Sequence, residues 1–541
     1  MTTPTITLPH GIDCEFLTLP ELLRARAASH GARTASTVDG AALSYAELDA
    51  KSDALAAGLQ RAGVAKGERV ATLLYNCREQ LLLWFACAKL GAVQAPMNVG
   101  LVADDLRYTL ANVDAKLFVT DAEGIAKFEP LRAHFAGLEV FVVGGAQPGA
   151  RSFAELEAPG VAWQMPALDP GDPLCIVYTG GTTGMPKGAL LPHFYFIASA
   201  YRWAWMLKLT PADSHFSVLQ LFHIGALTNA VAAPLLVGMP STLDRWFSLS
   251  SYWRRVRETG ATILDPMGSM FTLLTREPPS TLDRAHKARA AWAATAMLPA
   301  DVAPEFSRRF GIELIPCFGG TEVGGSIVVG MPSGSPDVGR ANGKPWGWCE
   351  LRIVDAWDQP LPAGELGQIA MRPTVPFSMM LGYHHNAERT VECWRNGWFH
   401  TGDLGYLDDA GLLHFVGRQA HWLRRRSENI SAQEVESAIS GCPGVREVVV
   451  VGVPSELGED EVKAFVVATD PAQPPAPQAI VDWCAARIAT FKVPRFIEFI
   501  ENLPRSAAKQ EIERHKLKAM PNGSAWDRTP GGERRASKGS A

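Results

Sequence analysis

The sequence predicts an α/β protein: a large N-terminal domain of layered α/β subdomains that includes a β-rich subdomain, followed by a small, mobile α+β C-terminal domain. Helical and strand patterns alternate over residues 43–100, which is typical of parallel α/β layers. From about residue 345 to 416 the pattern changes to short strands separated by Gly and Pro turns. The 541 residues are enough for at least two domains.

The elements follow from the spacing of apolar residues. In the N-terminal part we expect a helix at 45–63, a strand at 69–74, a helix at 80–90 that ends at Gly91, and strands at 117–120 and 139–143. In the C-terminal part we expect a helix at 432–439, strands at 448–453 and 462–467, and a helix at 479–488.

These patterns divide the chain into a large domain over residues 1–417, a hinge at 418–421 and a small domain at 422–520. The last stretch, 521–541, is rich in Gly, Ser, Arg and Lys, and its composition predicts disorder.

Composition excludes several classes of protein. The net charge of −5 gives no reason to expect a nucleic acid partner. The nine cysteines are scattered without a Cys-x-x-Cys pair, which fits a reducing compartment and argues against a structural zinc site. No signal peptide pattern is present, and the apolar run at 81–88 is too short for a membrane span. We expect a cytoplasmic protein, and a homodimer stays open.

A loop rich in Gly and Thr follows the apolar, strand-like residues 174–178. Its glycines free the backbone, and its hydroxyls and lysine supply donors, a combination that suits a polyphosphate. Pro186 before Lys187 excludes a Walker A loop. We expect the loop at a strand end, where open α/β sheets bind ligands. The candidate phosphate-binding residues are Thr179, Gly180, Gly181, Thr182, Thr183, Gly184 and Lys187.

Two further segments carry groups that a nucleotide site needs. Residues 318–322 are Phe-Gly-Gly-Thr-Glu, after the strand-like residues 312–315. An aromatic ring can stack on a purine, and a carboxylate can hold Mg²⁺ beside phosphates. Asp403 stands in Trp-Phe-His-Thr-Gly-Asp, where a carboxylate at a loop end can accept hydrogen bonds from both ribose hydroxyls. A strand-ending turn is the simpler interpretation of each segment alone.

Together these motifs closely resemble those of the adenylate-forming superfamily, which includes acyl-CoA synthetases, adenylation domains of peptide synthetases and beetle luciferases. The resemblance covers roughly residues 20–518. Within the superfamily, 424–431 and 454–463 are most like bacterial carnitine/crotonobetaine-CoA ligases. The loop departs from the family pattern at Gly180, where Ser is usual.

The resemblance assigns roles to individual residues. It implies that Phe318, with Gly319 and Gly320, flanks adenine, that Thr321 contacts the phosphate region and that Glu322 serves Mg²⁺. It places Asp403 on the ribose and Arg418 on the nucleotide at the end of the large domain. It also places Phe222 and His223 beside an acyl pocket that Met267 and Gly268 help to line, although Gln220 replaces the usual Pro.

A catalytic lysine is expected near the C-terminus, because charge redistributes there over the α-phosphate and the attacking carboxylate. In the family it stands after three residues that follow Leu-Pro-Arg-Thr. Here Leu-Pro-Arg-Ser ends at Ser506, and the counted position falls on Gln510 or Glu511. Lys509 is one or two residues away, and it is our candidate because a loop can absorb such a shift.

The resemblance implies an ATP-dependent carboxylic acid–CoA ligase that uses Mg²⁺. It would join a carboxylate to AMP with release of pyrophosphate, and then transfer the acyl group to CoA after the small domain rotates. An adenylating enzyme that loads a carrier protein and a catalytically impaired binding homologue stay open, with a luciferase-like oxidase more remote. The sequence does not identify the acid.

Overall fold

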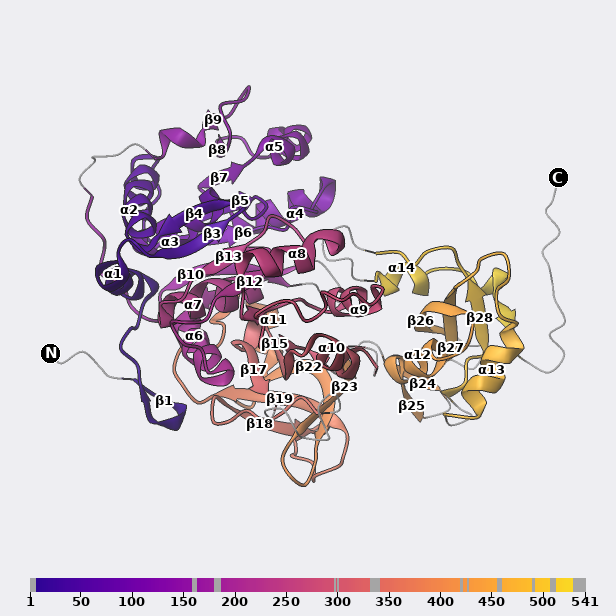
Figure 1. Ribbon diagram of the computed structural model, residues 1–541. Coiled ribbons are helices and arrows are strands. Elements are labelled where there is room, and N and C mark those ends of the chain that lie inside the picture. The colour runs from indigo at the N-terminus through magenta and orange to yellow at the C-terminus, as the bar shows by residue number, and fades with distance from the viewer. Residues whose placement is uncertain are drawn as a thin grey trace.

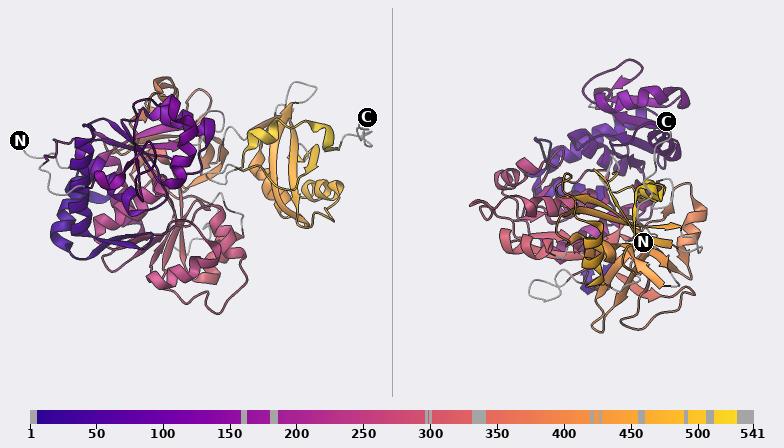
Figure 2. Two further views of the ribbon diagram at one scale, coloured as in Figure 1. Left: turned by 90° about the horizontal axis from the view of Figure 1, so that it is seen from above. Right: turned by 90° about the vertical axis from the view of Figure 1, so that its right-hand side faces the viewer.

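The computed structural model describes residues 6–157, 163–179, 186–295, 298, 301–330, 341–418, 422–425, 428–454, 460–488, 492–505 and 512–528. Residues up to 418 form a large layered body, and the elements from β24 onward form a smaller unit at one end of it (Figure 1). Figure 2 shows the same separation from above. The predicted α/β class, with a large N-terminal and a small C-terminal domain, is confirmed.

Two eight-stranded sheets form the frame of the large body. The first has the order β20 (Gly382–Tyr383), β11 (Lys187–Pro192), β10 (Pro173–Thr179), β6 (Val93–Pro96), β5 (Arg69–Leu73), β7 (Leu117–Thr120), β8 (Glu139–Val142) and β9 (Arg151–Ser152). Its strands from β10 to β9 are parallel, whereas β11 and β20 extend it by antiparallel pairing.

The second sheet has the order β17 (Gly325–Val329), β16 (Glu313–Gly320), β15 (Ala290–Ala293), β14 (Ile263–Leu264), β12 (His215–Ser217), β13 (Ser241–Leu243), β3 (Thr34–Val38) and β4 (Ala41–Ser44). Its central strands from β16 to β3 are parallel, and an antiparallel strand closes each edge. Loops that follow the parallel strands therefore emerge at one edge of the sheet.

Helices cover both sheets. Those of the large body are α1 (Leu19–His30), α2 (Tyr45–Arg61), α3 (Arg78–Leu90), α4 (Ala103–Val113), α5 (Ala122–Phe128), α6 (His193–Leu207), the π-helix η4 (Ala226–Ala232), α7 (Ala233–Val237), α8 (Leu249–Thr259), α9 (Ser269–Arg276), α10 (Val302–Phe310) and α11 (Ala387–Cys393). Helices α3 and α6 are almost wholly buried, and their aromatic residues join the two sheets in one continuous core. None of the helices among the described residues is long and apolar enough to cross a membrane.

The β-rich part expected at 345–416 is a five-stranded antiparallel sheet. It contains β18 (Cys349–Val354), β19 (Gly367–Pro373), β22 (Trp398–Leu407), β21 (Trp394–Arg395) and β23 (Leu413–Arg418). A small N-terminal hairpin, β1 (Thr7–Leu8) and β2 (Ile12–Asp13), lies at the opposite end of the chain.

The small unit consists of the hairpin β24 (Trp422–Arg425) and β25 (Glu428–Ser431), a four-stranded sheet of β26 (Val445–Pro454), β27 (Asp460–Ala468), β28 (Phe496–Phe499) and β29 (Trp526–Asp527), and helices α12 (Ala432–Ser440), α13 (Pro477–Ala485) and α14 (Arg514–Lys518). The predicted disorder from 521 is wrong for 521–528. Trp526 and Asp527 pair with β28, and Asp527 binds Arg495 at 3.1 Å. Polar composition concealed this strand because Trp526 is its single large apolar residue.

Candidate functional site

The loop rich in Gly and Thr joins two antiparallel strands. Thr179 is the last residue of β10 and lies opposite Lys187, the first residue of β11. The other candidates in this loop, Gly180, Gly181, Thr182, Thr183 and Gly184, lie outside the described residues. The expectation that the loop lies at a strand end is confirmed, because Thr179 ends β10 before it and Lys187 begins β11 after it.

Glu322 lies beside this loop, in the 3₁₀ turn η6 (Thr321–Val323) after β16. Its Oε1 atom accepts hydrogen bonds from the Thr179 hydroxyl at 3.1 Å and from the Tyr383 hydroxyl at 3.0 Å. The two motifs predicted to share a site are therefore in direct contact. Tyr383 was missed by sequence reasoning, because it lies 61 residues beyond Glu322 and no local pattern connects them.

Lys187 lies over the ring of Tyr383, with Nζ 5.4 Å from the ring centroid. Burial and, to a lesser extent, the nearby Arg389 guanidinium lower the pKa of Lys187 from its ordinary value. A cation that is partly removed from water interacts more strongly with an approaching anion. Its position at the start of β11 therefore suits contact with a phosphate.

The segment 318–320 continues β16, so the strand-ending turn that was the simpler interpretation of 318–322 holds only after Gly320. The strand extends through Gly320, and the turn begins at Thr321. A Cβ atom at Gly319 would lie 1.8 Å from the carbonyl oxygen of Gly325 on β17. Glycine is required at 319 because the two backbones approach too closely for any side chain.

Phe318 packs against Phe415 of β23, with ring centroids 5.7 Å apart. Asn342 connects the same two strands, since its Nδ2 donates to the Cys317 carbonyl at 3.2 Å and its Oδ1 accepts from the Phe415 amide at 3.1 Å. The candidate adenine-flanking ring is thereby fixed relative to the β-rich sheet.

Asp403 lies within β22, where it pairs with Arg418 of β23. The expected loop end is wrong: the Gly402 position has φ +75°, but the strand continues on both sides of it. The Asp403 amide donates to the Thr401 hydroxyl at 3.1 Å, and that hydroxyl donates to the Ile369 carbonyl at 2.9 Å. Because Phe415 and Arg418 share β23, the structure brings Phe318, Asp403 and Arg418 into one region.

One face of α6 holds the turn that carries Thr321 and Glu322. Tyr195, Ser199 and Arg202 are spaced along that face, and all are buried. The Tyr195 hydroxyl donates to the Thr321 carbonyl at 2.9 Å, and the Ser199 hydroxyl donates to the Gly324 carbonyl at 3.1 Å. The Arg202 Nε donates to the Ser326 carbonyl at 2.9 Å. Sequence reasoning missed these residues because they lie in an apolar helix that precedes the motif by more than a hundred residues.

The four candidates for the acyl pocket follow neighbouring parallel strands. Phe222 and His223 follow β12, and Met267 and Gly268 follow β14, so both segments emerge at the same edge of the sheet. The Phe222 side chain is buried against the His223 ring, with centroids 4.6 Å apart. Met267 is 42% exposed, and Gly268 has φ +48° with open space around its Cβ position. The positions suit the rim of a pocket.

Gln220 replaces the proline of the family pattern and has a structural role. Its Nε2 donates to the Arg245 carbonyl at 2.8 Å. The buried side chain of Asn76 holds the same segment. Its Nδ2 donates to the Leu219 carbonyl and its Oδ1 accepts from the Leu221 amide, both at 2.8 Å. The path of the loop before His223 is thus fixed by side-chain hydrogen bonds.

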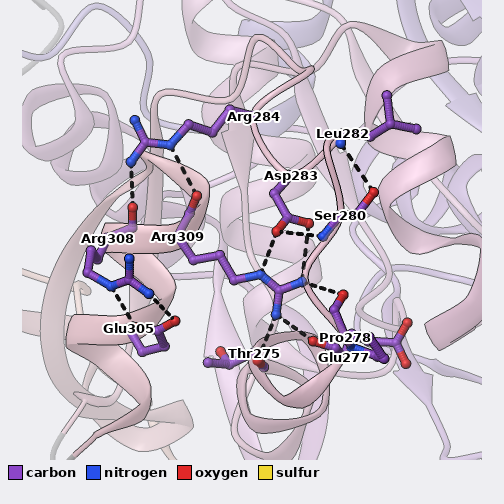
Figure 3. A network of polar contacts seen from close by, with 10 residues as sticks. All are labelled: Thr275, Glu277, Pro278, Ser280, Leu282, Asp283, Arg284, Glu305, Arg308 and Arg309. Atoms are coloured by element: carbon purple, nitrogen blue, oxygen red, sulfur yellow. Dashed lines mark hydrogen bonds and ion pairs between the residues drawn. The ribbon is translucent and has the colours of Figure 1, made fainter.

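Arg309 anchors the end of α9, the helix that begins at Gly268 and Ser269 (Figure 3). Its Nη1 donates to the Thr275 carbonyl at 2.9 Å, and its Nε donates to Asp283 at 2.7 Å. Figure 3 shows that the guanidinium joins the end of α9, the following loop and α10. This network fixes the helix that follows the expected pocket residues.

Lys509 lies outside the described residues, but both sides of its loop are anchored. Arg505 and Ile512 form an antiparallel bridge, and Arg505 forms an ion pair with Glu447. Arg514 binds both oxygens of Glu436, at 2.5 and 2.9 Å. The described residues on both sides of 506–511 are therefore held by contacts within the small domain.

The residues fit a magnesium ion carried by a nucleotide. Among the described residues, no group of three His, Cys, Asp or Glu side chains could hold a metal alone. Glu322 uses Oε1 for two hydroxyl donors, whereas Oε2 accepts no hydrogen bond from any described residue. One carboxylate oxygen beside a phosphate loop is the donor set that Mg²⁺ uses when substrate phosphates and water complete its coordination.

Comparison with known proteins agrees with this geometry. The model of the AMP-binding enzyme family matches residues 23–384, and that of the AMP-binding enzyme C-terminal domain matches 434–509. A crotonobetaine/carnitine–CoA ligase of Escherichia coli O1:K1 / APEC is 31% identical over 488 residues, which cover 87% of this chain and 92% of the relative.

Solved structures extend the likeness to the whole fold. An anthranilate CoA ligase in complex with anthranoyl-AMP has a TM-score of 0.83 and 25% identity, over 93% of this chain and 96% of that one. The O-succinylbenzoate coenzyme A synthetase of Bacillus subtilis, with ATP and magnesium, has a TM-score of 0.81 and 26% identity, over 92% and 99%. The chain belongs to the AMP-binding enzyme family.

Proposed function

We propose that this protein is an ATP-dependent carboxylic acid–CoA ligase that forms an acyl-AMP intermediate. The observation that carries the proposal is the contact between Thr179, at the phosphate loop, and Glu322, in a chain whose relatives include named CoA ligases. Phe318, Asp403 and Arg418 lie in the adjoining region and supply groups for adenine, ribose and nucleotide.

In the first step, a carboxylate oxygen of the acid attacks the α-phosphorus of ATP, and pyrophosphate leaves with its electron pair. Thr179, Lys187 and the loop glycines position the phosphates, while Phe318 and Asp403 hold the nucleoside. Lys509 balances the negative charge that develops between the carboxylate and the α-phosphate. Bound Mg²⁺ would withdraw charge from the phosphate oxygens, with Glu322 as its protein ligand.

In the second step, the thiol of CoA loses its proton and attacks the acyl carbon, and AMP leaves. The small domain would rotate at 418–421 between the two steps, so that different faces of it complete the site in turn. The described residues that flank 506–511 are held within the small domain by the Arg505–Ile512 bridge and the Arg514–Glu436 ion pair, which suits such an exchange.

The acid binds between the loops that follow β12 and β14, where Phe222, His223, Met267 and Gly268 lie. Relatives and structural neighbours are named for crotonobetaine and carnitine, for anthranilate and for O-succinylbenzoate, so betaine, aromatic and aromatic dicarboxylic acids form the first test panel. The Phe222 and Met267 side chains favour acids with an apolar body.

Acid-dependent exchange of pyrophosphate into ATP tests the function directly. We expect exchange with at least one acid of the panel and, with CoA present, formation of its CoA thioester. Lys509→Ala should lower exchange at least 100-fold and spare thioester formation from supplied acyl-AMP. Lys516→Ala, which removes an exposed lysine of the same domain, is the matched control.

Two results would separate the alternatives. Exchange without thioester formation from free CoA would favour a carrier protein as acceptor. Absence of exchange with every acid, despite nucleotide binding, would favour a binding homologue. Normal exchange by Lys509→Ala would contradict the role assigned to Lys509.

A further inference from the structure

Tyr383 and Thr179 occupy the same oxygen of Glu322. Both hydroxyls donate to Oε1, at 3.0 and 3.1 Å, and a carboxylate oxygen has two lone pairs in the plane of the group. These donors therefore use the hydrogen-bonding capacity of Oε1. Oε2 is left as the oxygen that can meet a cation.

The backbone around Tyr383 is fixed from three directions. The Tyr383 amide donates to the Thr390 hydroxyl at 2.8 Å. The neighbouring His384 amide donates to the Gly188 carbonyl at 2.8 Å, and the Met380 amide donates to the Glu322 carbonyl at 3.0 Å. The strand that carries the tyrosine is thus tied to the phosphate-loop hairpin and to the turn of Glu322.

The same tyrosine also contacts the lysine at the phosphate loop. Its ring lies under Lys187, with Nζ 5.4 Å from the ring centroid, so one side chain contacts both this cation and the Glu322 carboxylate.

We propose that Tyr383 is a positioning residue for the metal site: its hydroxyl holds Glu322 in the one orientation that presents Oε2 to the magnesium of Mg·ATP. The inference rests on the proposed function. Without this hydroxyl the carboxylate would retain a single side-chain donor and could rotate, so that metal binding would carry an added ordering cost.

Tyr383→Phe tests the proposal because it removes the hydroxyl and keeps the ring under Lys187. Binding is measured with Mn²⁺ and an ATP analogue that has a methylene group between the α- and β-phosphorus atoms, with free Mn²⁺ followed by electron paramagnetic resonance. We expect Mn²⁺ to bind about tenfold more weakly to the variant. Affinity for the analogue in EDTA should stay within twofold of the wild type.

Tyr178→Phe is the matched control. Tyr178 precedes Thr179 on β10 and is also partly buried, but its hydroxyl donates to Asn112 Oδ1 at 2.7 Å, away from Glu322. The control should lose a hydrogen bond and some thermal stability without a change in Mn²⁺ affinity.

Glu322→Gln provides the second test. If Tyr383 acts through Glu322, adding Tyr383→Phe to Glu322→Gln should change Mn²⁺ affinity by less than twofold. Unchanged or tighter Mn²⁺ binding by Tyr383→Phe alone would overturn the proposal, and tighter binding would mean that the hydroxyl competes with the metal. A wild-type protein that binds no Mn²⁺ with the analogue would instead contradict the proposed function.

Discussion

At the scale of single residues, His215 and Asp265 form a buried pair behind the candidate acyl pocket. His215 Nε2 lies 3.6 Å from Asp265 Oδ2, and both side chains are 1% exposed. Burial lowers the pKa of His215 to about 3 and raises the pKa of Asp265 to about 8. Around neutral pH the folded pair therefore carries one proton and no net charge.

This pair makes stability depend on pH. Between pH 6.5 and 8 the aspartate is charged in the unfolded chain but largely protonated in the folded chain. The histidine is neutral in the folded chain, whereas about half of it is protonated in the unfolded chain at pH 6.5. The folded state binds more protons there, so the free energy of unfolding falls as pH rises. Deprotonation of Asp265 removes about 1.6 kcal/mol, and the unfolded histidine offsets part of this, so we expect a net loss of about 1 kcal/mol across this range.

Asp265→Asn checks the sign by thermal or chemical unfolding at pH 6.5 and pH 8. The amide does not titrate, so the variant should lack this part of the decline. An equal decline in wild type and variant would show that Asp265 is not the group responsible.

Some site residues follow from the sequence and others do not. Thr179, Lys187 and Glu322 stand in compact motifs whose composition indicates phosphate and metal chemistry, and the structure brings Thr179 and Glu322 into contact. Tyr383 contacts the distant Glu322 through its hydroxyl, and Asn342 contacts two distant strands through its side-chain amide. Such long-range contacts leave no periodicity or spacing that a single sequence could reveal.

At the scale of elements, α6 supports the turn that carries Thr321 and Glu322. Tyr195→Phe removes the hydrogen bond to the Thr321 carbonyl and leaves that buried acceptor unpaired. We expect a loss of about 1–2 kcal/mol in unfolding free energy. Without this hydrogen bond the turn that carries Glu322 would be less firmly held, so kcat/KM for ATP should fall about tenfold.

Tyr201→Phe is the comparison for this prediction. Tyr201 lies on the same helix, but its hydroxyl accepts from the Glu15 amide at 3.1 Å, in the N-terminal segment. The Tyr201 variant should lose stability without a change in kcat/KM for ATP. Equal kinetic effects of the two variants would argue against a specific role of α6 at the turn.

The residues at which β16 and β22 end could not be predicted from the sequence pattern. Gly319 and Gly320 continue β16 although their composition also permits a turn, and at Gly319 the close approach of β17 excludes a side chain. Asp403 likewise lies inside β22. Glycine permits both a turn and a crowded strand, and only the neighbouring strand decides between them.

At the scale of the whole molecule, the end of the described chain completes the small domain. Lys463 is fully buried and binds Glu498 at 2.7 Å, the Pro521 carbonyl at 3.2 Å and Asn522 at 3.1 Å. A chain that ends at 520 would lose two of these partners and β29. We expect its small domain to unfold about 2–4 kcal/mol more easily.

A chain that ends at 528 is the control and should match the full-length protein. Thermal unfolding and limited proteolysis of the three chains would test the prediction. Equal stability of the chain that ends at 520 would mean that β29 contributes nothing measurable.

The layered large domain could be predicted from the sequence, whereas the last strand of the small domain could not. Alternation of helices and strands predicted the layered large domain, because burial on both faces of parallel strands gives long apolar runs. The predicted domain limits and hinge at 418–421 remain predictions. β29 was missed because a two-residue strand takes its stability from the sheet it joins.

The occupied oxygen of Glu322 has a consequence for ion selectivity. Calcium commonly takes both oxygens of a carboxylate, whereas magnesium takes one in a strict octahedron. With Oε1 engaged by two hydroxyls, Glu322 can offer a cation only a single point of contact. Discrimination between the two ions would then come from neutral hydroxyl groups that never touch the metal.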